Sequence, residues 1–391
     1  MKTIELPASK SLSARALIIN ALAEKPCALH NLSDCDDTKA MLQGLENHDI
    51  VDIGPAGTAM RFLTAYFAVQ PQREVLLTGS ERMLQRPIRI LVEALKNLGA
   101  DVEYAGEEGF PPLKIRGRKL AGGEVTLSAS VSSQYISALM MIAPTLKNGL
   151  TLHLEGAVAS RPYIEMTRGL MKEWGVTTEW KGNSIVIPAQ EYRRERDFEV
   201  EGDWSAASYL YEISSVMGDG ISVKGLSLKS LQGDARIAGL FEKLGVKTEE
   251  TSDRLLLSSC PMPSVSLLEI DFSDIPDMAQ TFVVTSCLKG VPFHFTGLKS
   301  LKIKETDRIA ALIAECGKLG WELVEPADGE LSWDGTTHAA TSLSIATYHD
   351  HRMAMSFAPA KVKYPELKIE NPEVVSKSFP NFWEVFAEFN L

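Results

Sequence analysis

Positively charged side chains recur where helices are predicted to begin. A helix N-terminus carries a partial positive charge, so lysine and arginine are unfavourable there by roughly a few tenths of a kcal/mol unless an anion lies between them. Backbone N–H groups at a helix start can bind phosphate or carboxylate, and a nearby guanidinium can add two parallel hydrogen bonds. The cations concerned are Lys10, Arg15, Arg61, Arg86, Lys304, Arg308 and Arg352. Any one alone could be a solvated surface cation, but their recurrence predicts a site for anionic ligands.

Small and polar side chains occur near these cations. Gly57 lies at a predicted helix start, where the lack of a side chain would let an anionic ligand approach the backbone closely. Serine, glutamine and tyrosine at two further helix starts could hydrogen-bond to a hydroxylated, phosphorylated ligand, or could simply cap the helices. These residues are Ser132, Ser133, Gln134, Ser160 and Tyr163.

Two carboxylates lie beside the cations in the sequence. Asp277 follows Pro276, and Glu305 is adjacent to Lys304. A pair of acids in different surroundings is what general acid–base chemistry requires. Either carboxylate could instead be a first-turn acid that complements a helix dipole.

A metal site is not favoured. In His349-Asp350-His351 alternate residues near a strand-to-helix junction point in different directions, and no third ligand has recognisable spacing. The five cysteines are odd in number, scattered and free of CxxC spacing, so neither a disulfide framework nor a zinc site is predicted.

Composition restricts the class of ligand. The formal net charge of −11 argues against nucleic acid, which is bound through a basic surface. An anionic ligand must therefore be held by a local cluster of cations. No segment approaches the roughly 20 apolar residues of a membrane helix, and no secretion signal is recognisable at the start. We expect a soluble, cytoplasmic protein.

The elements that must position these residues alternate between helix and strand. Helical periodicity predicts about twelve helices, separated by short strands, which favours a repeated α/β unit of about 60 residues. The predicted helices begin near Ser11, Asp36, Gly57, Pro87, Ser132, Pro162, Asp203, Asp234, Pro276, Glu305, His351 and Pro380. A length of 391 residues suits two domains. A polar stretch over 190–197 predicts their boundary near Gly202.

Five short motifs resemble the 5-enolpyruvylshikimate-3-phosphate synthase family. They occur in the family's order, continue to Lys377-Ser378-Phe379-Pro380, and cover essentially the whole chain. The motifs are Leu6–Arg15, Ala56–Arg61, Arg82–Ile88, Lys304–Arg308 and Asp350–Met355. Each is short, but their joint occurrence is specific.

The resemblance implies an inside-out α/β barrel fold in which each of two domains contains three βαβαββ units. The domain on the shikimate 3-phosphate side would span 9–201, the second domain would combine 1–8 with 202–391, and the active site would lie in the interdomain cleft. About seventeen residues separate Asp37 from Pro55, less than half the family's usual length. One early unit is therefore expected to be truncated.

The resemblance also implies two substrate sites that share Gln134. The shikimate 3-phosphate site would contain Lys10, Ser11, Arg15, Ser132, Ser133, Gln134, Ser160, Tyr163, Asp277 and Lys304. The phosphoenolpyruvate site would contain Gly57, Arg86, Gln134, Arg308, Arg352 and Lys377. Lys10 would face both substrates.

The implied reaction is addition followed by elimination, without a metal or organic cofactor. The 5-hydroxyl attacks C2 of phosphoenolpyruvate while C3 is protonated, and phosphate then leaves. Asp277 is the candidate base and Glu305 the candidate acid, with Lys10 sharing the proton transfers. The implied role is a step of the shikimate pathway toward chorismate and aromatic amino acids, carried out by a monomer.

Two alternatives remain. A related enolpyruvyl transferase acts on UDP-N-acetylglucosamine, but its loop cysteine has no counterpart in the segment 79–86. A ligand-binding relative that has lost catalysis is conceivable because of the shortened early unit. The retained Asp277, Glu305 and Lys10 argue against it, since binding alone would not require them.

Overall fold

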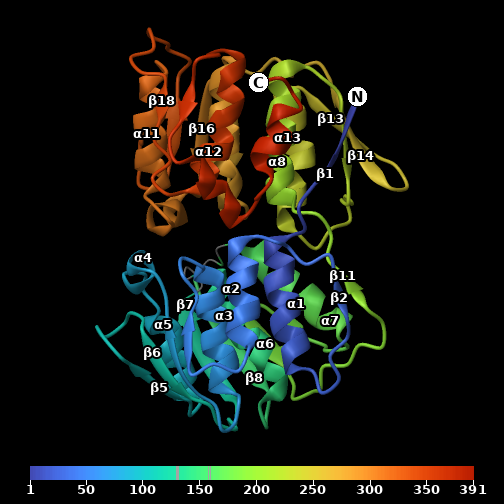
Figure 1. Ribbon diagram of the computed structural model, residues 1–391, viewed down its shortest axis with the longest axis vertical. Helices are drawn as coiled ribbons and strands as arrows, with labels where there is room; N and C mark the ends of the chain where they lie inside the picture. The colour runs from blue at the N-terminus through green and yellow to red at the C-terminus, as the bar shows by residue number, and fades with distance from the viewer. Residues whose placement is uncertain (129–131, 157, 159) are drawn as a thin grey trace. The chain divides into compact units, whose positions relative to one another are not determined.

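The computed structural model describes residues 1–128, 132–156, 158 and 160–391. The chain forms two compact units, drawn with their elements in Figure 1. Unit 1 combines Met1–Pro7 with Glu201–Leu391, and unit 2 is Ala8–Val200. Each junction lies one residue before the boundary expected from the sequence.

Unit 2 contains two four-stranded sheets that share one topology, with the same strand order and the same strand directions. The strands are β3 (Ile50–Asp52), β4 (Glu74–Thr78), β5 (Asp101–Tyr104), β6 (Leu113–Arg116), β7 (Gly123–Ser128), β8 (Leu150–Glu155), β9 (Glu179–Lys181) and β10 (Ser184–Ile187). Their orders are β3-β4-β6-β5 and β7-β8-β10-β9. In each sheet the first two strands are parallel and the remaining pairs antiparallel. A third sheet pairs only β2 (Leu29–His30) with β11 (Phe198–Glu199).

The helices of unit 2 begin close to the predicted positions. They are α1 (Lys10–Leu22), α2 (Asp36–Leu45), α3 (Gly57–Ala68), α4 (Glu81–Leu84), α5 (Arg89–Asn97), α6 (Ser133–Ile142), η1 (Ala143–Thr145) and α7 (Arg161–Glu173). The short helix α4 is not predicted by periodicity, and α5 begins two residues after Pro87. Helices α3 and α6 are buried on nearly all faces, as expected for helices that are apolar all round. The chain therefore runs β-α-β-α-β-β through both four-stranded sheets.

Unit 1 repeats this connection in the sheet β1-β12-β14-β13. Its strands are β1 (Lys2–Glu5), β12 (Ile221–Lys224), β13 (Val246–Glu250), β14 (Arg254–Ser259), β15 (Leu268–Asp271), β16 (Phe293–Thr296), β17 (Leu331–Trp333), β18 (Ser344–Ile345) and β19 (Lys368–Ile369). The strands β15-β16-β17 form a second sheet, and β18 pairs with β19. In β14 the side chains of Leu255 and Leu257 are buried, and the alternation that places them on one face is typical of a strand packed on one side.

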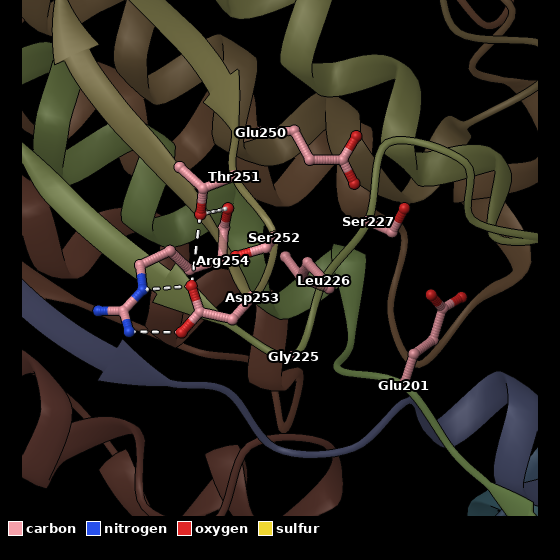
Figure 2. A pocket seen from close by; sticks show the side chains of 9 residues that line it. All are labelled: Glu201, Gly225, Leu226, Ser227, Glu250, Thr251, Ser252, Asp253 and Arg254. Atoms are coloured by element: carbon pink, nitrogen blue, oxygen red, sulfur yellow. Dashed lines mark hydrogen bonds and ion pairs between the residues drawn. The ribbon is translucent and has the colours of Figure 1, made fainter.

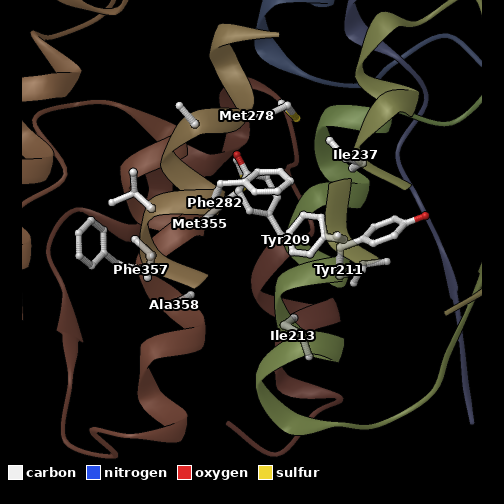
Figure 3. Close-up of a cluster of buried hydrophobic side chains, with 14 of the residues drawn as sticks. Tyr209, Tyr211, Ile213, Ile237, Met278, Phe282, Met355, Phe357 and Ala358 are labelled. Atoms are coloured by element: carbon white, nitrogen blue, oxygen red, sulfur yellow. The ribbon is translucent and has the colours of Figure 1, made fainter. Parts of the chain in front are cut away.

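The helices of unit 1 surround an aromatic core. They are α8 (Trp204–Met217), η2 (Gly233–Arg236), α9 (Ile237–Leu240), η3 (Phe241–Leu244), η4 (Pro276–Met278), α10 (Ala279–Lys289), η5 (Lys299–Ile303), α11 (Arg308–Lys318), α12 (His351–Phe357), η6 (Ala358–Val362), η7 (Pro372–Lys377) and α13 (Phe382–Ala387). Figure 3 shows Tyr209 and Tyr211 of α8 and Phe282 of α10 among these buried side chains. No helix among the described residues is long and apolar enough to cross a membrane.

Helix α11 corrects one predicted boundary. It begins at Arg308 rather than at Glu305, because the Asp307 carboxylate accepts hydrogen bonds from the backbone N–H groups of Ile309 and Ala310, each at 3.1 Å. An aspartate in this position is a preferred N-cap. Arg308 is therefore the first helical residue, and Glu305 lies in the preceding loop.

Candidate active site

Arg308 lies at the centre of a charged cluster in unit 1. Its side chain is almost completely buried. The guanidinium donates to Asp277 Oδ1 at 2.8 Å, to Glu305 Oε2 at 3.0 Å and to Asp350 Oδ2 at 2.6 Å. Burial alone would lower the pKa of this guanidinium, but the three carboxylates raise it above its ordinary value. Arg308 is therefore a permanent cation that orients three acids.

Asp277 has two further cationic neighbours. Lys304 Nζ lies 3.4 Å from Asp277 Oδ1, and Arg352 Nη2 lies 3.5 Å from Asp277 Oδ2. Burial opposes ionisation of Asp277, but the neighbouring cations outweigh it and hold the carboxyl pKa well below its ordinary value. Asp277 is therefore ionised at neutral pH.

Glu305 connects a second lysine to the cluster. Lys377 Nζ, at the end of η7, lies 3.1 Å from Glu305 Oε1. Together these residues form the Asp277 cluster, defined as Asp277, Lys304, Glu305, Arg308, Asp350, Arg352 and Lys377. All six unit 1 residues predicted from the sequence belong to this cluster. Among the described residues it combines four cations with three carboxylates, a composition suited both to anion binding and to proton transfer.

Asp350 is a member of the cluster that residue types alone did not identify. Its carboxylate caps α12 by accepting a hydrogen bond from Arg352 N at 2.9 Å, while also holding Arg308. The sequence offered one signal, an aspartate directly before a predicted helix, which is a common N-cap. Tyr348 and His349, which precede it, have φ values of 54° and 55°. Such left-handed conformations cost on the order of 1–3 kcal/mol each in non-glycine residues and often occur at functional sites.

A buried carboxylate lies behind Arg352. Arg352 Nη2 donates to Ser205 Oγ at 3.3 Å, and Ser205 Oγ in turn donates to Asp234 Oδ2 at 2.5 Å. Burial raises the pKa of Asp234 to about 6, although Ser205 and Arg352 oppose the shift. The burial of Asp234 depends on packing between distant segments, so the sequence marked Asp234 only as a helix start and not as a buried acid.

In unit 2, two arginines converge on Gly57. A Cβ atom at this position would lie 2.7 Å from Arg86 Nη1 and 3.0 Å from Arg61 Nη1. Arg61 also donates to the carbonyl oxygens of Gly57 at 3.0 Å and Pro87 at 3.3 Å. Within the described part of the chain, no side chain accepts a hydrogen bond from the Arg86 guanidinium. Two cations and a helix N-terminus therefore meet where a side chain is missing, as in an anion site.

Lys10 is the first residue of α1. Its Nζ lies 3.2 Å from Asp37 Oδ2 in the first turn of α2. Ser9 precedes it and accepts a hydrogen bond from the backbone N–H of Leu12 at 3.4 Å, which caps the helix. Ser11 follows as the second helical residue. The cation at this helix start is thus balanced in part by a carboxylate.

Arg15 is predicted to bind substrate, but its guanidinium is buried and already bound within unit 2. It donates to Thr167 Oγ1 at 2.8 Å and to the Ser11 carbonyl oxygen at 2.9 Å. Weaker bonds of 3.4 Å reach Ser137 Oγ and the Tyr163 carbonyl oxygen. Burial lowers the pKa of Arg15 to about 10. These contacts join the first two turns of α1, α6 and α7, so Arg15 fixes these three helices relative to each other.

The polar residues predicted at helix starts have different structural roles. Ser132 Oγ accepts from Gln134 N at 3.3 Å and caps α6, where Ser133 is the first helical residue. The Gln134 side chain donates to Thr58 Oγ1 at 3.1 Å and so joins α6 to the start of α3. Ser160 precedes α7 with a left-handed φ of 53° and makes no side-chain cap. The missing cap bond and the left-handed backbone favour a ligand contact over plain capping.

A surface pocket in unit 1 contains none of these residues. Figure 2 shows its lining, which includes the carboxylates Glu201, Glu250 and Asp253, with Asp253 paired to Arg254. Three acids and one paired arginine have the wrong charge for phosphate. The pocket is therefore not a candidate for the predicted anion site.

The fold has close counterparts among solved structures. Two structures of EPSP synthase from Acinetobacter baumannii cover 99% of this chain and 95% of their own, with TM-scores of 0.78 and 0.76. Their sequences are 19% and 18% identical to this chain, so the likeness shows the fold. The mixed α/β architecture is that of the EPSP synthases.

Sequence comparison gives the family. The model for EPSP synthase (3-phosphoshikimate 1-carboxyvinyltransferase) matches residues 1–48 and 45–386. A 3-phosphoshikimate 1-carboxyvinyltransferase from Bacteroides fragilis is 54% identical over 388 residues, covering 97% of this chain and 93% of the relative. One from Pseudoalteromonas atlantica is 34% identical over 410 residues, covering 97% and 94%. The chain belongs to the EPSP synthase family, which confirms the resemblance drawn from the motifs.

Proposed function

We propose that this chain transfers the enolpyruvyl group of phosphoenolpyruvate to the 5-hydroxyl of shikimate 3-phosphate, releasing phosphate, in the shikimate pathway. Family membership over nearly the whole chain supports this activity. The observation that carries it is the Asp277 carboxylate held by Arg308 at 2.8 Å and Lys304 at 3.4 Å. A potential base thus lies among cations suited to phosphate and carboxylate.

Asp277 is the proposed base. Because neighbouring cations hold its pKa low, it is a weak base in the cluster as it stands. A phosphate or carboxylate bound to those cations would offset their charge and raise the pKa of Asp277. Substrate binding would thereby prepare Asp277 to take the proton of the 5-hydroxyl as that oxygen attacks C2.

Glu305 is the proposed acid toward C3 of phosphoenolpyruvate, and the two roles reverse in the elimination. Its contacts with Arg308 at 3.0 Å and Lys377 at 3.1 Å support a fixed orientation. Lys10 is proposed to share the proton transfers. The cations contribute by orienting substrates and by stabilising charge that develops as phosphate leaves.

The family resemblance assigns residues of both units to this one reaction. The proposed ligands of shikimate 3-phosphate are Lys10, Ser11, Ser132, Ser133, Gln134, Ser160, Tyr163, Asp277 and Lys304, and the resemblance places Arg15 in the same site. Those of phosphoenolpyruvate are Gly57, Arg86, Gln134, Arg308, Arg352 and Lys377. Because protein oxygens already bind the Arg15 guanidinium, we assign Arg15 to support of the shikimate 3-phosphate site.

The finer architecture is part of the proposal. We infer the inside-out arrangement of three βαβαββ units in each domain, with one early unit shortened. The family model matches in two segments that overlap at residues 45–48, next to the short interval between α2 and α3. The two-residue strands β2 and β11 also support a reduced unit. A cytoplasmic monomer without an organic cofactor completes the proposal.

Phosphate release with the purified protein tests the activity. We expect release that requires both substrates and ceases when either is omitted. Replacing shikimate 3-phosphate by UDP-N-acetylglucosamine should abolish it. Calorimetric binding of shikimate 3-phosphate without turnover would instead identify a binding protein, and turnover only with the nucleotide sugar would identify the related transferase.

A further inference from the structure

Two buried charged residues share one face of helix α11. Arg308 and Glu315 are seven residues apart, close to two helical turns, and both side chains are essentially inaccessible to solvent. Arg308 belongs to the Asp277 cluster, whereas Glu315 has no part in the proposed proton transfers. Both contact the segment 346–350, which leads from β18 into α12.

Glu315 binds this segment through both carboxylate oxygens. Tyr348 Oη donates to Oε1 at 2.6 Å, and Ala346 N donates to Oε2 at 3.0 Å. Lys318 Nζ, one turn along α11, also lies 2.6 Å from Oε2. Burial and the bond to Glu315 raise the pKa of the Tyr348 phenol to about 12, so it remains a donor at neutral pH. Three donors therefore compensate for the buried carboxylate.

The bound segment contains the strained backbone that precedes Asp350. Tyr348 and His349 both have positive φ, and Asp350 N donates to the Thr347 carbonyl oxygen at 2.8 Å. Left-handed non-glycine residues persist only where the surroundings strongly determine them. Helix α11 holds both ends of this segment. Glu315 binds Ala346 and Tyr348, and Arg308 binds Asp350.

We propose that Glu315 and Tyr348 are positioning residues for Arg308 and Arg352, the two proposed phosphoenolpyruvate-binding arginines of unit 1. Their hydrogen bond fixes the turn, the turn directs Asp350, and Asp350 orients Arg308 directly and Arg352 through the start of α12. The inference rests on the proposed activity. A bond that served only stability would leave the substrate affinities of the folded protein unchanged.

The variant Tyr348→Phe removes one hydrogen bond and keeps the ring. We expect KM for phosphoenolpyruvate to rise about 5- to 20-fold, while KM for shikimate 3-phosphate stays within about twofold. Tyr364→Phe is the matched control, because Tyr364 Oη donates to the Leu319 carbonyl oxygen at 3.0 Å, at the end of the same helix. It should leave both KM values unchanged. Glu315→Gln should raise KM for phosphoenolpyruvate more than Tyr348→Phe does. The amide NH₂ group would face the N–H and O–H donors that the carboxylate now accepts from.

Calorimetry with phosphoenolpyruvate alone gives a second measure on the same proteins. Weaker binding by Tyr348→Phe than by Tyr364→Phe is expected whether or not the wild type turns over. An inactive wild type would refute the proposed activity. An unchanged affinity for phosphoenolpyruvate in folded Tyr348→Phe, equal to that of the control, would overturn the positioning role. If Glu315→Gln fails to fold, comparing the phosphoenolpyruvate affinities of Tyr348→Phe and Tyr364→Phe still tests the positioning role.

Discussion

The charged groups of the two units differ in how their charges are balanced. In the Asp277 cluster of unit 1, Arg308 binds three carboxylates, and Lys304 and Lys377 are each paired with an acid. Around Gly57 in unit 2, Arg61 binds backbone carbonyl oxygens, and no described side chain accepts from Arg86. The cations of the first group are shared with carboxylates, whereas no described side chain shares the Arg86 guanidinium of the second group.

This difference in charge balance indicates that the two groups contribute differently to ligand binding and to proton transfer. Among the described residues no side chain accepts from the Arg86 guanidinium, so this cation is available to attract an anionic ligand and to provide binding. Cations shared with acids connect binding to proton transfer, because a ligand that engages them changes the pKa of the acids. The two proposed acid–base carboxylates therefore belong to unit 1, and unit 2 contributes Lys10 to the proton transfers together with affinity and orientation.

Asp277→Asn should have the largest effect. We expect kcat to fall by roughly 10²- to 10⁴-fold, the range typical of a lost general base. KM for phosphoenolpyruvate should stay constant or fall, because three cations lose a competing carboxylate. Steady-state kinetics on folded protein measures both values.

The matched control for Asp277 is Asp328→Asn. Asp328 is exposed in the same unit and pairs with Lys302 at 2.8 Å and Lys299 at 3.2 Å. Its loss should leave kcat unchanged. A folded Asp277→Asn protein with kcat within about threefold of the wild type would exclude Asp277 as the base.

Asp234→Asn should change the pH dependence of stability. The folded-state pKa of about 6 exceeds the unfolded value of about 3.9, so the folded protein binds more protons between these limits. The Asp234 contribution is therefore most favourable below about pH 4 and is lost as pH rises to about 6. The unfolding free energy of the wild type minus that of the variant should fall by up to about 3 kcal/mol over this range.

Denaturant unfolding between pH 4 and pH 7.5 measures this difference. Asp274→Asn removes an exposed carboxylate of the same unit, which pairs with Arg236 at 2.6 Å, and serves as the charge control. If the difference in unfolding free energy between the wild type and Asp234→Asn does not vary with pH, burial does not shift the pKa of Asp234.

Gly57→Ala should have a smaller effect, confined to unit 2. The new Cβ would meet Arg86 Nη1 at 2.7 Å and displace it. We expect KM for phosphoenolpyruvate to rise about 10- to 30-fold, equivalent to about 1.4–2 kcal/mol, within the usual cost of overpacking. Gly317→Ala adds the same methyl group within α11, where nothing lies within 4 Å, and should leave kinetics unchanged. An unchanged KM in Gly57→Ala would remove Gly57 and Arg86 from the phosphoenolpyruvate site.

The sequence predicted the parts of the site that depend on local order. Lys304, Glu305 and Arg308 are close in the chain, and polar caps such as Asp307 and Ser132 mark the starts of α11 and α6. Local order therefore indicated which side chains lie at helix starts. The predicted start of α11 near Glu305 lies three residues too early, because the Asp307 carboxylate caps the helix.

Other parts depend on contacts between distant segments. Asp350 reaches Arg308 across 42 positions, and its direction depends on the left-handed backbone at Tyr348 and His349. Left-handed backbone is uncommon in residues other than glycine, so the sequence marked Asp350 as a possible helix cap but did not predict its contact with Arg308. Likewise, Arg15 reads as a ligand-binding cation, but its burial against Thr167 depends on the packing of three helices.

The fate of the hydrogens at C3 of phosphoenolpyruvate tests the central claim most directly. Addition makes C3 a methyl group, and elimination then removes one of its hydrogens. We predict that the reaction in D₂O yields an enol ether at the 5-hydroxyl with deuterium in its vinyl methylene group, seen by NMR. Formation of the ether without deuterium, or no ether from the folded protein, would contradict the account.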